Sequence, residues 1–255
     1  ICFVANDTRK TYLYTSEKID GPWKKQLIEG FYHDGSLLFD EDGRNYIVYG
    51  NDEIWITELN EDLTAPKKDG LHRLLVSDHK NPELGYEGSH IQKINGYYYI
   101  FLIHSLRDRW MRTEACFYSD SLEGEFTGGD VLCDDRGYCG QGVAQGGIVD
   151  TPDGKWYAML FQDSGAVGRL PILLPVTWKD HFPVFGQNGH VPEEIEVHST
   201  RPGYIYQPLV GSDDFCNGLL PRWQFNHDPD PRYYHLDALQ GTYTITTREV
   251  CTELT

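Results

Sequence analysis

Three short stretches share one pattern and decide the fold: DGRNYIVYG (residues 42–50), NGYYYIFL (95–102) and DGKWYAML (153–160). Each joins Asp-Gly or Asn-Gly to an aromatic-rich apolar run. This is the strongest short-range signal for a β-hairpin, because a tight turn needs positive φ at its central residues. The hairpins begin 53 and 58 residues apart. A four-stranded unit repeated at about 50 residues indicates a β-propeller, whose blades pack around a central axis.

A second repeat lies inside the first. YLYTSEKIDGPW (12–23) matches ACFYSDSLEGEF (115–126) in its aromatic strand, polar turn, Gly and following apolar residue. The second copy follows the apolar strand of a hairpin, whereas the first copy follows only ICFVAND (1–7). We therefore expect Ile1 to lie within a strand whose partner is missing, and the chain to begin after the first blade.

Composition agrees with one large all-β domain or two smaller ones. The chain has 255 residues, of which 40% are hydrophobic and 13% aromatic, and no amphipathic run of three helical turns. A formal charge of −17 repels phosphate backbones, which argues against nucleic-acid binding. No apolar run is long enough to span a membrane. The six cysteines contain no CxxC pair and favour scattered buried thiols. The oligomeric state and the compartment are left open, with an intracellular location slightly favoured over a secreted one.

A connector divides the chain into two expected domains. The Pro-rich, polar stretch from Val191 to Pro208 leaves the repeat region, and no hairpin follows it in register with the earlier period. We expect residues 1–207 to form a partial propeller and residues 208–255 to form the first strands of a β-sandwich.

Two carboxylates stand in phase with the hairpins. Glu87 lies between Gly85 and Gly88 ahead of one hairpin, and Asp34 lies 53 residues earlier, ahead of another. Because equivalent loops of a propeller reach the same end of its channel, the two should face each other there. A pair of carboxylates at one sugar is what glycoside hydrolysis needs. The alternatives are that Glu87 is an ordinary polar loop residue and that Asp34 caps a turn.

Two further polar residues continue this series. Gln145 occupies the corresponding place one repeat further on, and Arg169 follows Gly168 ahead of an apolar strand. A guanidinium is a poor core group but binds sugar hydroxyls or carboxylates as a fork. The alternative is that Arg169 is an ordinary surface residue.

With these residues in view, the sequence resembles glycoside hydrolase family 43, which consists of five-bladed propellers that cleave xylan and arabinan side chains and oligomers. HDGSLLFDEDGRNYIVYG (33–50) resembles the D-P-S segment of the family, with Gly35 where Pro is usual. YEGSHIQKINGYYYIFL (86–102) resembles its E-G-P-H segment, with Ser89 where Pro is usual. Residues 145–178 resemble the xylosidase-like members that carry a C-terminal sandwich, and residues 213–231 resemble the start of that concanavalin-like sandwich.

The resemblance implies roles for four residues. Glu87 matches the general acid, Asp34 matches the carboxylate that raises the pKa of the acid and orients it, and Arg169 matches an arginine that contacts the substrate. Gln145 would also lie at the substrate. Members of the family often have His at the Gln145 position, beside a hydrated metal ion. Gln argues against calcium here, although its carbonyl oxygen can bind a hard ion through water, and no cofactor is expected to be required. The general base of the family is an Asp in the first blade, and nothing in this chain matches it.

The leading hypothesis is therefore a glycosidase, a β-xylosidase or an α-L-arabinofuranosidase, that releases xylose or arabinose from oligosaccharides with inversion. A propeller that binds carbohydrate without cleaving it is the first alternative. A protein-interaction propeller is the second, and it would carry no carboxylates in its channel.

Overall fold

The structure, a computed structural model, describes residues 2–6, 9–197, 199, 201–205, 208, 210–220, 222–223 and 230–247. Ile1, on which the prediction of a mid-strand start rests, lies outside the described residues. The chain divides into two compact units, Ile1–Glu196 and Val197–Thr255. Among the described residues, no helix is both long and apolar enough to cross a membrane.

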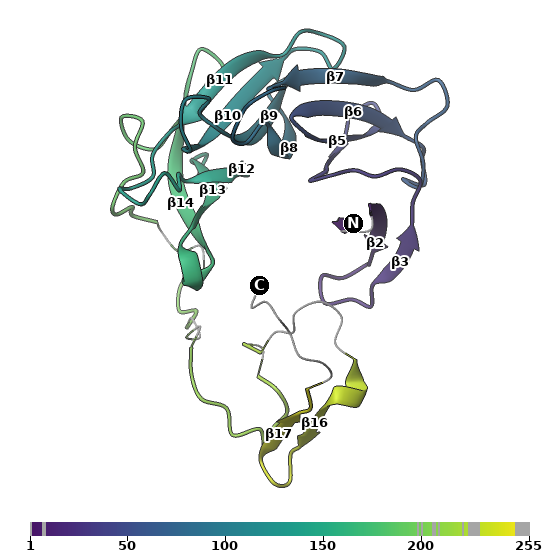
Figure 1. The fold of residues 1–255 in the computed structure, drawn as a ribbon, viewed down its shortest axis with the longest axis vertical. Helices are drawn as coiled ribbons and strands as arrows, with labels where there is room; N and C mark the ends of the chain where they lie inside the picture. Colours follow the sequence, from purple (N-terminus) through teal and green to yellow (C-terminus); the bar gives the residue numbers. More distant parts are fainter. Residues whose placement is uncertain are drawn as a thin grey trace. The chain divides into compact units, whose positions relative to one another are not determined.

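The first unit is a series of antiparallel sheets, each formed by consecutive strands (Figure 1). A three-stranded sheet comes first, and three four-stranded sheets follow it. The three-stranded sheet contains β1 (Cys2–Asn6), β2 (Lys10–Thr15) and β3 (Lys24–Leu27). The next contains β4 (Ser36–Phe39), β5 (Asn45–Asn51), β6 (Glu53–Leu59) and β7 (His72–Ser77). The third contains β8 (Glu87–Ile94), β9 (Tyr97–Ser105), β10 (Arg112–Ser119) and β11 (Thr127–Leu132). The fourth contains β12 (Ala144–Asp150), β13 (Trp156–Asp163), β14 (Arg169–Lys179) and β15 (Phe182–Phe185), with a short 3₁₀ helix η1 (Gly165–Val167) before β14.

The three quoted hairpins join the first two strands of each four-stranded sheet, β4–β5, β8–β9 and β12–β13. Only Asn95-Gly96 forms the two-residue turn in which both residues have positive φ, at 51° and 85°. In the other two loops Gly43 and Gly154 alone adopt positive φ. Their loops run over five residues, 40–44 and 151–155, so the expectation of a two-residue turn is wrong there. The extra residues relieve the Asp of the strained conformation.

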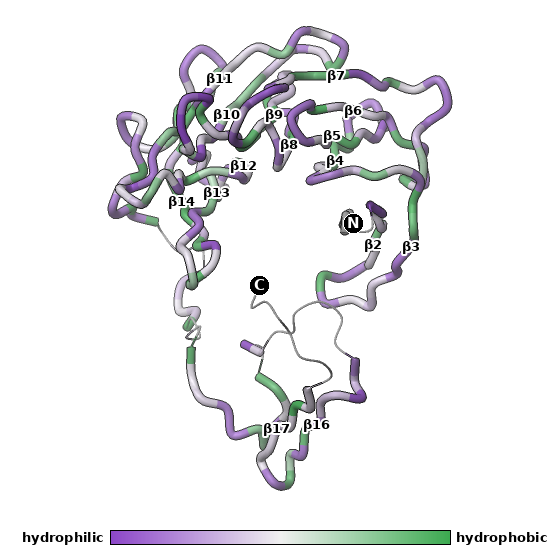
Figure 2. The backbone as a smooth tube through the Cα atoms, in the orientation of Figure 1, coloured by the Kyte–Doolittle hydropathy of each residue, from purple (hydrophilic) through white to green (hydrophobic). Residues whose placement is uncertain are grey.

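Neighbouring sheets of this unit are joined by apolar side chains, so that each sheet buries its faces against the next. One cluster, which includes Ile54 and Ile100, joins the sheets that begin at β4 and β8. A second, which includes Phe101 and Leu174, joins the sheets that begin at β8 and β12. A third, which includes Leu13 and Ile47, joins the sheets of β2 and β5. Hydrophobic and hydrophilic residues are mixed along the strands, and hydrophilic stretches mark many of the loops (Figure 2). The recurring strand and hairpin signals thus predict an all-β fold, and the structure confirms it.

The second unit contains a short 3₁₀ helix η2 (Pro231–Tyr233) and one described hairpin of β16 (Tyr234–Asp237) and β17 (Thr242–Ile245). The division at 196/197 falls inside the stretch that the sequence marks as a connector. Residues 224–229 and 248–255 lie outside the described residues. That residues 208–255 begin a sandwich therefore stays a prediction.

The expectation that the cysteines are buried is wrong for most of those described. Cys116 is buried in the second cluster, but Cys133, Cys139 and Cys216 are exposed free thiols. The exposed three lie outside the strands, in loops where the alternation of a strand does not force a side chain inward.

Candidate functional site

Glu87 opens β8 at an irregularity in its pairing with β9. The register shifts between Glu87 and His90, and Gly88 adopts a φ of 62° within this bulge. A Cβ on Gly88 would lie 2.4 Å from Nε2 of Gln145, and a Cβ on Gly85 would lie 2.0 Å from Oδ1 of Asp52. Both glycines that flank Glu87 are therefore required by side chains that fill the space beside them. This contact also brings Gln145 next to the segment that carries Glu87.

We expect Gly88→Ala to destabilise the fold by about 1–3 kcal/mol and to lower kcat/KM, because it adds both an unfavourable φ and a clash at the Glu87 bulge. Gly96→Ala is the matched control, since its φ is 85° but nothing lies within 4 Å of the added Cβ. Chemical denaturation and steady-state kinetics on both variants separate the two effects. Equal losses of stability and activity in the two variants would mean that the space beside Glu87 is unimportant.

Asp34 lies in the loop before β4, in a left-handed conformation with a φ of 47°. Its carboxylate accepts no backbone hydrogen bond among the described residues, so nothing in this part of the chain supports the alternative in which it caps a turn. One oxygen of Asp34 lies 3.7 Å from Nε2 of His33, and Oε2 of Glu87 lies 3.6 Å from the same nitrogen. The described segments thus bring the two in-phase carboxylates together around one imidazole.

Two serines fix the segments that carry these carboxylates. The hydroxyl of Ser89 donates to the carbonyl oxygens of Asp34 and Val48, at 2.8 Å each. In the opposite direction, the Ser36 hydroxyl accepts from the backbone N–H of Ile91 at 3.1 Å. Each serine lies two residues after one of the carboxylates, so the pair of bonds is reciprocal. The separation of Asp34 and Glu87 is therefore set by the contact between two sheets rather than by a flexible loop.

The environment of Glu87 favours its protonated form. Burial is the largest cause that raises the pKa of Glu87, and the like charge of Asp34 raises it further. His33 and Arg112 oppose this rise. A carboxyl whose pKa is raised keeps its proton to higher pH, which is the property that a general acid requires.

Arg169 lies near Arg112, with Asp163 between the two guanidinium groups. Its Nε lies 3.3 Å from one oxygen of Asp163, and the other oxygen of Asp163 accepts a hydrogen bond from Arg112. Both guanidinium groups lie 4.6 Å from the centroid of the Phe161 ring. The side chain of Arg112 is only 4% exposed, whereas that of Arg169 is 65% exposed and free to meet a ligand. The charge of Arg112 acts on the pKa of Glu87, whereas a contact of Arg169 with the substrate stays a prediction.

Gln145 contacts a buried carboxyl. Its backbone N–H donates to Oε2 of Glu114 at 2.6 Å, while Oε1 of Glu114 is buried without a hydrogen-bond partner among the described residues. Complete burial raises the pKa of Glu114 well above its usual value and so disfavours its ionised form. Calcium prefers ionised carboxylates and other oxygen ligands. An amide beside a carboxyl that disfavours ionisation is a poor fit for that ion, and we derive no step through a metal at Gln145.

His33, Asp34 and Glu87 offer one ligand atom each within 4.8 Å of one another, a spacing that metal sites also show. Exposed acidic groups commonly have this spacing without an ion. Metal ligands must be deprotonated, whereas Glu87 is disposed to keep its proton. The raised pKa of Glu87 disfavours the form that would bind a metal, and we derive no step through a metal at these three side chains.

Sequence reasoning missed His33, Asn51, Arg112, Glu114 and Asp163. A signal for two of them exists, because Asn51 and Asp163 end the second strands of their sheets, β5 and β13. The hairpin spacing that identifies Asp34 and Glu87 could also have been applied to the ends of these second strands. His33, Arg112 and Glu114 have no such marker, because their importance depends on burial and on contacts between sheets.

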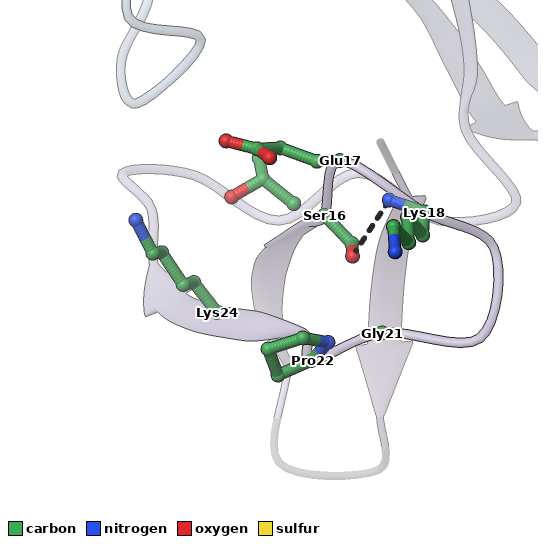
Figure 3. Close-up of a pocket in the computed structure, with 7 residues that line it drawn as sticks. Ser16, Glu17, Lys18, Gly21, Pro22 and Lys24 are labelled. Atoms are coloured by element: carbon green, nitrogen blue, oxygen red, sulfur yellow. Dashed lines mark hydrogen bonds between the residues drawn. The ribbon is translucent and has the colours of Figure 1, made fainter.

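A separate hollow of about 470 Å³ lies at the loop between β2 and β3 (Figure 3). Ser16, Glu17, Lys18, Gly21, Pro22 and Lys24 line it together with Thr15. None of the four site residues predicted from the sequence contributes to it. Its lining comes from a single hairpin loop, whereas the carboxylate site is assembled from several sheets.

Comparison with known proteins shows the family of this chain. Residues 2–183 match the model of "Glycosyl hydrolases family 43". A solved structure described as "Bifunctional GH43-CE" from Bacteroides eggerthii is similar at 41% identity and a TM-score of 0.80, over 97% of this chain and 32% of that one.

Curated proteins are also similar to this chain in sequence. A "Beta-xylosidase" from Formosa agariphila is 26% identical, over 94% of this chain and 46% of its own length. A "Xylosidase/arabinosidase" from Butyrivibrio fibrisolvens is also 26% identical, over 80% of this chain and 44% of its own length. The chain thus spans about half the length of the curated relatives that it matches. Its matched residues include every sheet of the first unit and all four predicted site residues, and the chain belongs to glycosyl hydrolases family 43.

Proposed function

We propose that this chain provides the general acid of a glycosidase that releases xylose or arabinose from xylan-derived oligosaccharides with inversion. The observation that carries the proposal is the position of Glu87. Its carboxyl has a raised pKa, lies beside Asp34 and belongs to a segment that bonds directly to the Asp34 segment. The names of the curated relatives support the class of sugar.

In this mechanism Glu87 donates its proton to the glycosidic oxygen as the bond to the sugar breaks. Asp34 keeps that proton on Glu87 until the substrate is bound, because the negative charge of Asp34 opposes ionisation. Arg169 binds the sugar through its exposed guanidinium, and Gln145 lies beside the acid at the substrate. The residues thus divide into one proton donor, one charge that tunes it and groups that hold the sugar.

The general base has to be a further carboxylate. In inverting enzymes the acid and the base are about 6.5–9.5 Å apart, so that a water fits between the base and the sugar. One oxygen of Asp34 and one of Glu87 lie within 4.8 Å of each other, which leaves no room for that water. We therefore assign Asp34 to tuning rather than to activation of water, and place the base outside the residues assigned here.

We further propose that the sheets of the first unit are blades of a five-bladed propeller and that residues 208–255 begin a C-terminal sandwich. Three successive four-stranded antiparallel sheets with the same strand order support the propeller. The hairpin of β16 and β17 supports a β-domain after it.

The complete gene product that carries this chain should hydrolyse 4-nitrophenyl β-D-xylopyranoside or 4-nitrophenyl α-L-arabinofuranoside. If it accepts the xyloside, proton NMR should detect α-xylose as the first product, because inversion changes the anomeric configuration. Retention of configuration would contradict the assigned mechanism. Binding of xylo-oligosaccharides without any turnover would instead favour the carbohydrate-binding propeller.

A further inference from the structure

We infer that Asn51 is a positioning residue that decides which oxygen of Glu87 carries the catalytic proton. The inference rests on the proposed function, because it concerns the same acid. The side-chain Nδ2 of Asn51 lies 2.9 Å from Oε2 of Glu87. Asn51 thereby becomes a neutral partner of the acid, in addition to its charged neighbours.

The backbone holds Asn51 between the two carboxylate segments. The N–H of Gly50, just before it, donates to the carbonyl of His33 at 3.0 Å. The N–H of Asp52, just after it, donates to the carbonyl of Tyr86 at 2.9 Å. Asn51 is thus flanked by one bond to the residue before Asp34 and one bond to the residue before Glu87. These two backbone hydrogen bonds therefore hold Asn51 at a place from which its side chain contacts Glu87.

The chemistry of the amide selects one oxygen. An amide N–H₂ only donates, so Oε2 has to accept, both in the ionised carboxylate and as the carbonyl oxygen of the neutral acid. With Nδ2 towards Glu87, the contact remains favourable when the carboxyl ionises, whereas the opposite orientation would then set the amide oxygen against a carboxylate. His33 Nε2 lies on the same side, 3.6 Å from Oε2. Oε1 makes no hydrogen bond to a described residue, so it is the oxygen that carries the proton and presents it to the glycosidic oxygen.

The bond also affects the pKa of Glu87, with a sign that can be tested. A hydrogen bond to a carboxylate is stronger when the carboxylate is ionised, so Asn51 favours the ionised form and lowers the pKa of Glu87. The charged or titratable groups that face Glu87 are Asp34 and His33 from the loop before β4 and Arg112 from β10. Removal of Asn51 leaves all of these in place. The pKa of Glu87 should then rise, whereas loss of Asp34 should lower it.

The test compares Asn51→Ala and the isosteric Asn51→Asp with Asn45→Ala, a control at the other end of β5. In the complete gene product, Asn51→Ala should lose about tenfold in kcat on xylobiose, because an acid that can turn presents its proton less often. On an activated aryl xyloside, kcat of Asn51→Ala should fall by less than about threefold, since the leaving group needs little protonation. The basic limb of the kcat/KM profile should move to higher pH in Asn51→Ala. It should move further in Asn51→Asp, which replaces the donor by a like charge. Asn45→Ala should leave kcat on both substrates and the position of the basic limb unchanged.

A second measurement does not need activity. In protein labelled with ¹³C at the glutamate carboxyl, the Glu87 resonance, assigned by its absence in Glu87→Gln, should titrate at higher pH in Asn51→Ala than in the wild type. Equal losses of kcat on both substrates in Asn51→Ala would overturn the role of Asn51. A Glu87 carboxyl that titrates at the same pH as in the wild type, or at a lower pH, would also overturn it. A Glu87→Gln variant with full activity on xylobiose would overturn the proposed function itself, and the titration would still decide whether Asn51 bonds to Glu87.

Discussion

Replacement of Glu87 by Gln should reduce kcat on xylobiose and other substrates with poor leaving groups by about a thousandfold, within the range of about 10²–10⁴ expected for general acid catalysis. Gln has nearly the same shape as Glu but has no proton to give to the glycosidic oxygen. KM should change little, because substrate binding through the exposed guanidinium of Arg169 is retained. An activated aryl glycoside should lose much less, since the need for acid assistance grows with the basicity of the leaving group.

Steady-state kinetics across a series of aryl glycosides would measure this effect as a steeper dependence on the pKa of the leaving group. Glu83→Gln is the matched control, because Glu83 is an exposed carboxylate in the loop ahead of the same strand. If kcat of Glu87→Gln falls by the same factor for all leaving groups, then Glu87 does not act as the acid.

Replacement of Asp34 by Asn should slow the reaction by about tenfold to a hundredfold and move the basic limb of the pH–rate profile to lower pH. The charge of Asp34 raises the pKa of Glu87, so its removal lets Glu87 ionise earlier as the pH rises. At a fixed neutral pH a smaller share of the enzyme would then hold the required proton. Burial, the larger cause of the raised pKa, remains, so the limb should move only part of the way.

The measurement is kcat/KM across pH for the wild type, Asp34→Asn and Asp42→Asn, in which the control removes a carboxylate at the hairpin of the same sheet. A basic limb that stays in place in Asp34→Asn, with a rate loss alone, would assign Asp34 to substrate binding rather than to the pKa of the acid. A limb that moves upward would contradict the electrostatic argument outright.

The sequence predicts the all-β fold and the proximity of Asp34 and Glu87 from one property, the spacing of the hairpins. The spacing in the sequence predicts positions in space because residues one repeat apart occupy equivalent places in successive sheets. Turn geometry was predicted less well, since Asp42-Gly43 and Asp153-Gly154 look like Asn95-Gly96 in sequence but lie in longer loops. The roles of His33, Arg112 and Glu114 depend on burial and on neighbours from other sheets, which no local pattern encodes.

Asp34, Glu87 and Gln145 each stand nine residues before the hairpin glycines Gly43, Gly96 and Gly154, and each is followed directly by a glycine. Repetition of one structural unit therefore provides three equivalent positions, one at the start of each four-stranded sheet. The side chains at these three positions differ, with a carboxylate in the first two copies and an amide in the third. Under the proposed function, no single copy of the unit holds both the acid and the carboxylate that tunes it, so the reaction depends on copies that differ from one another.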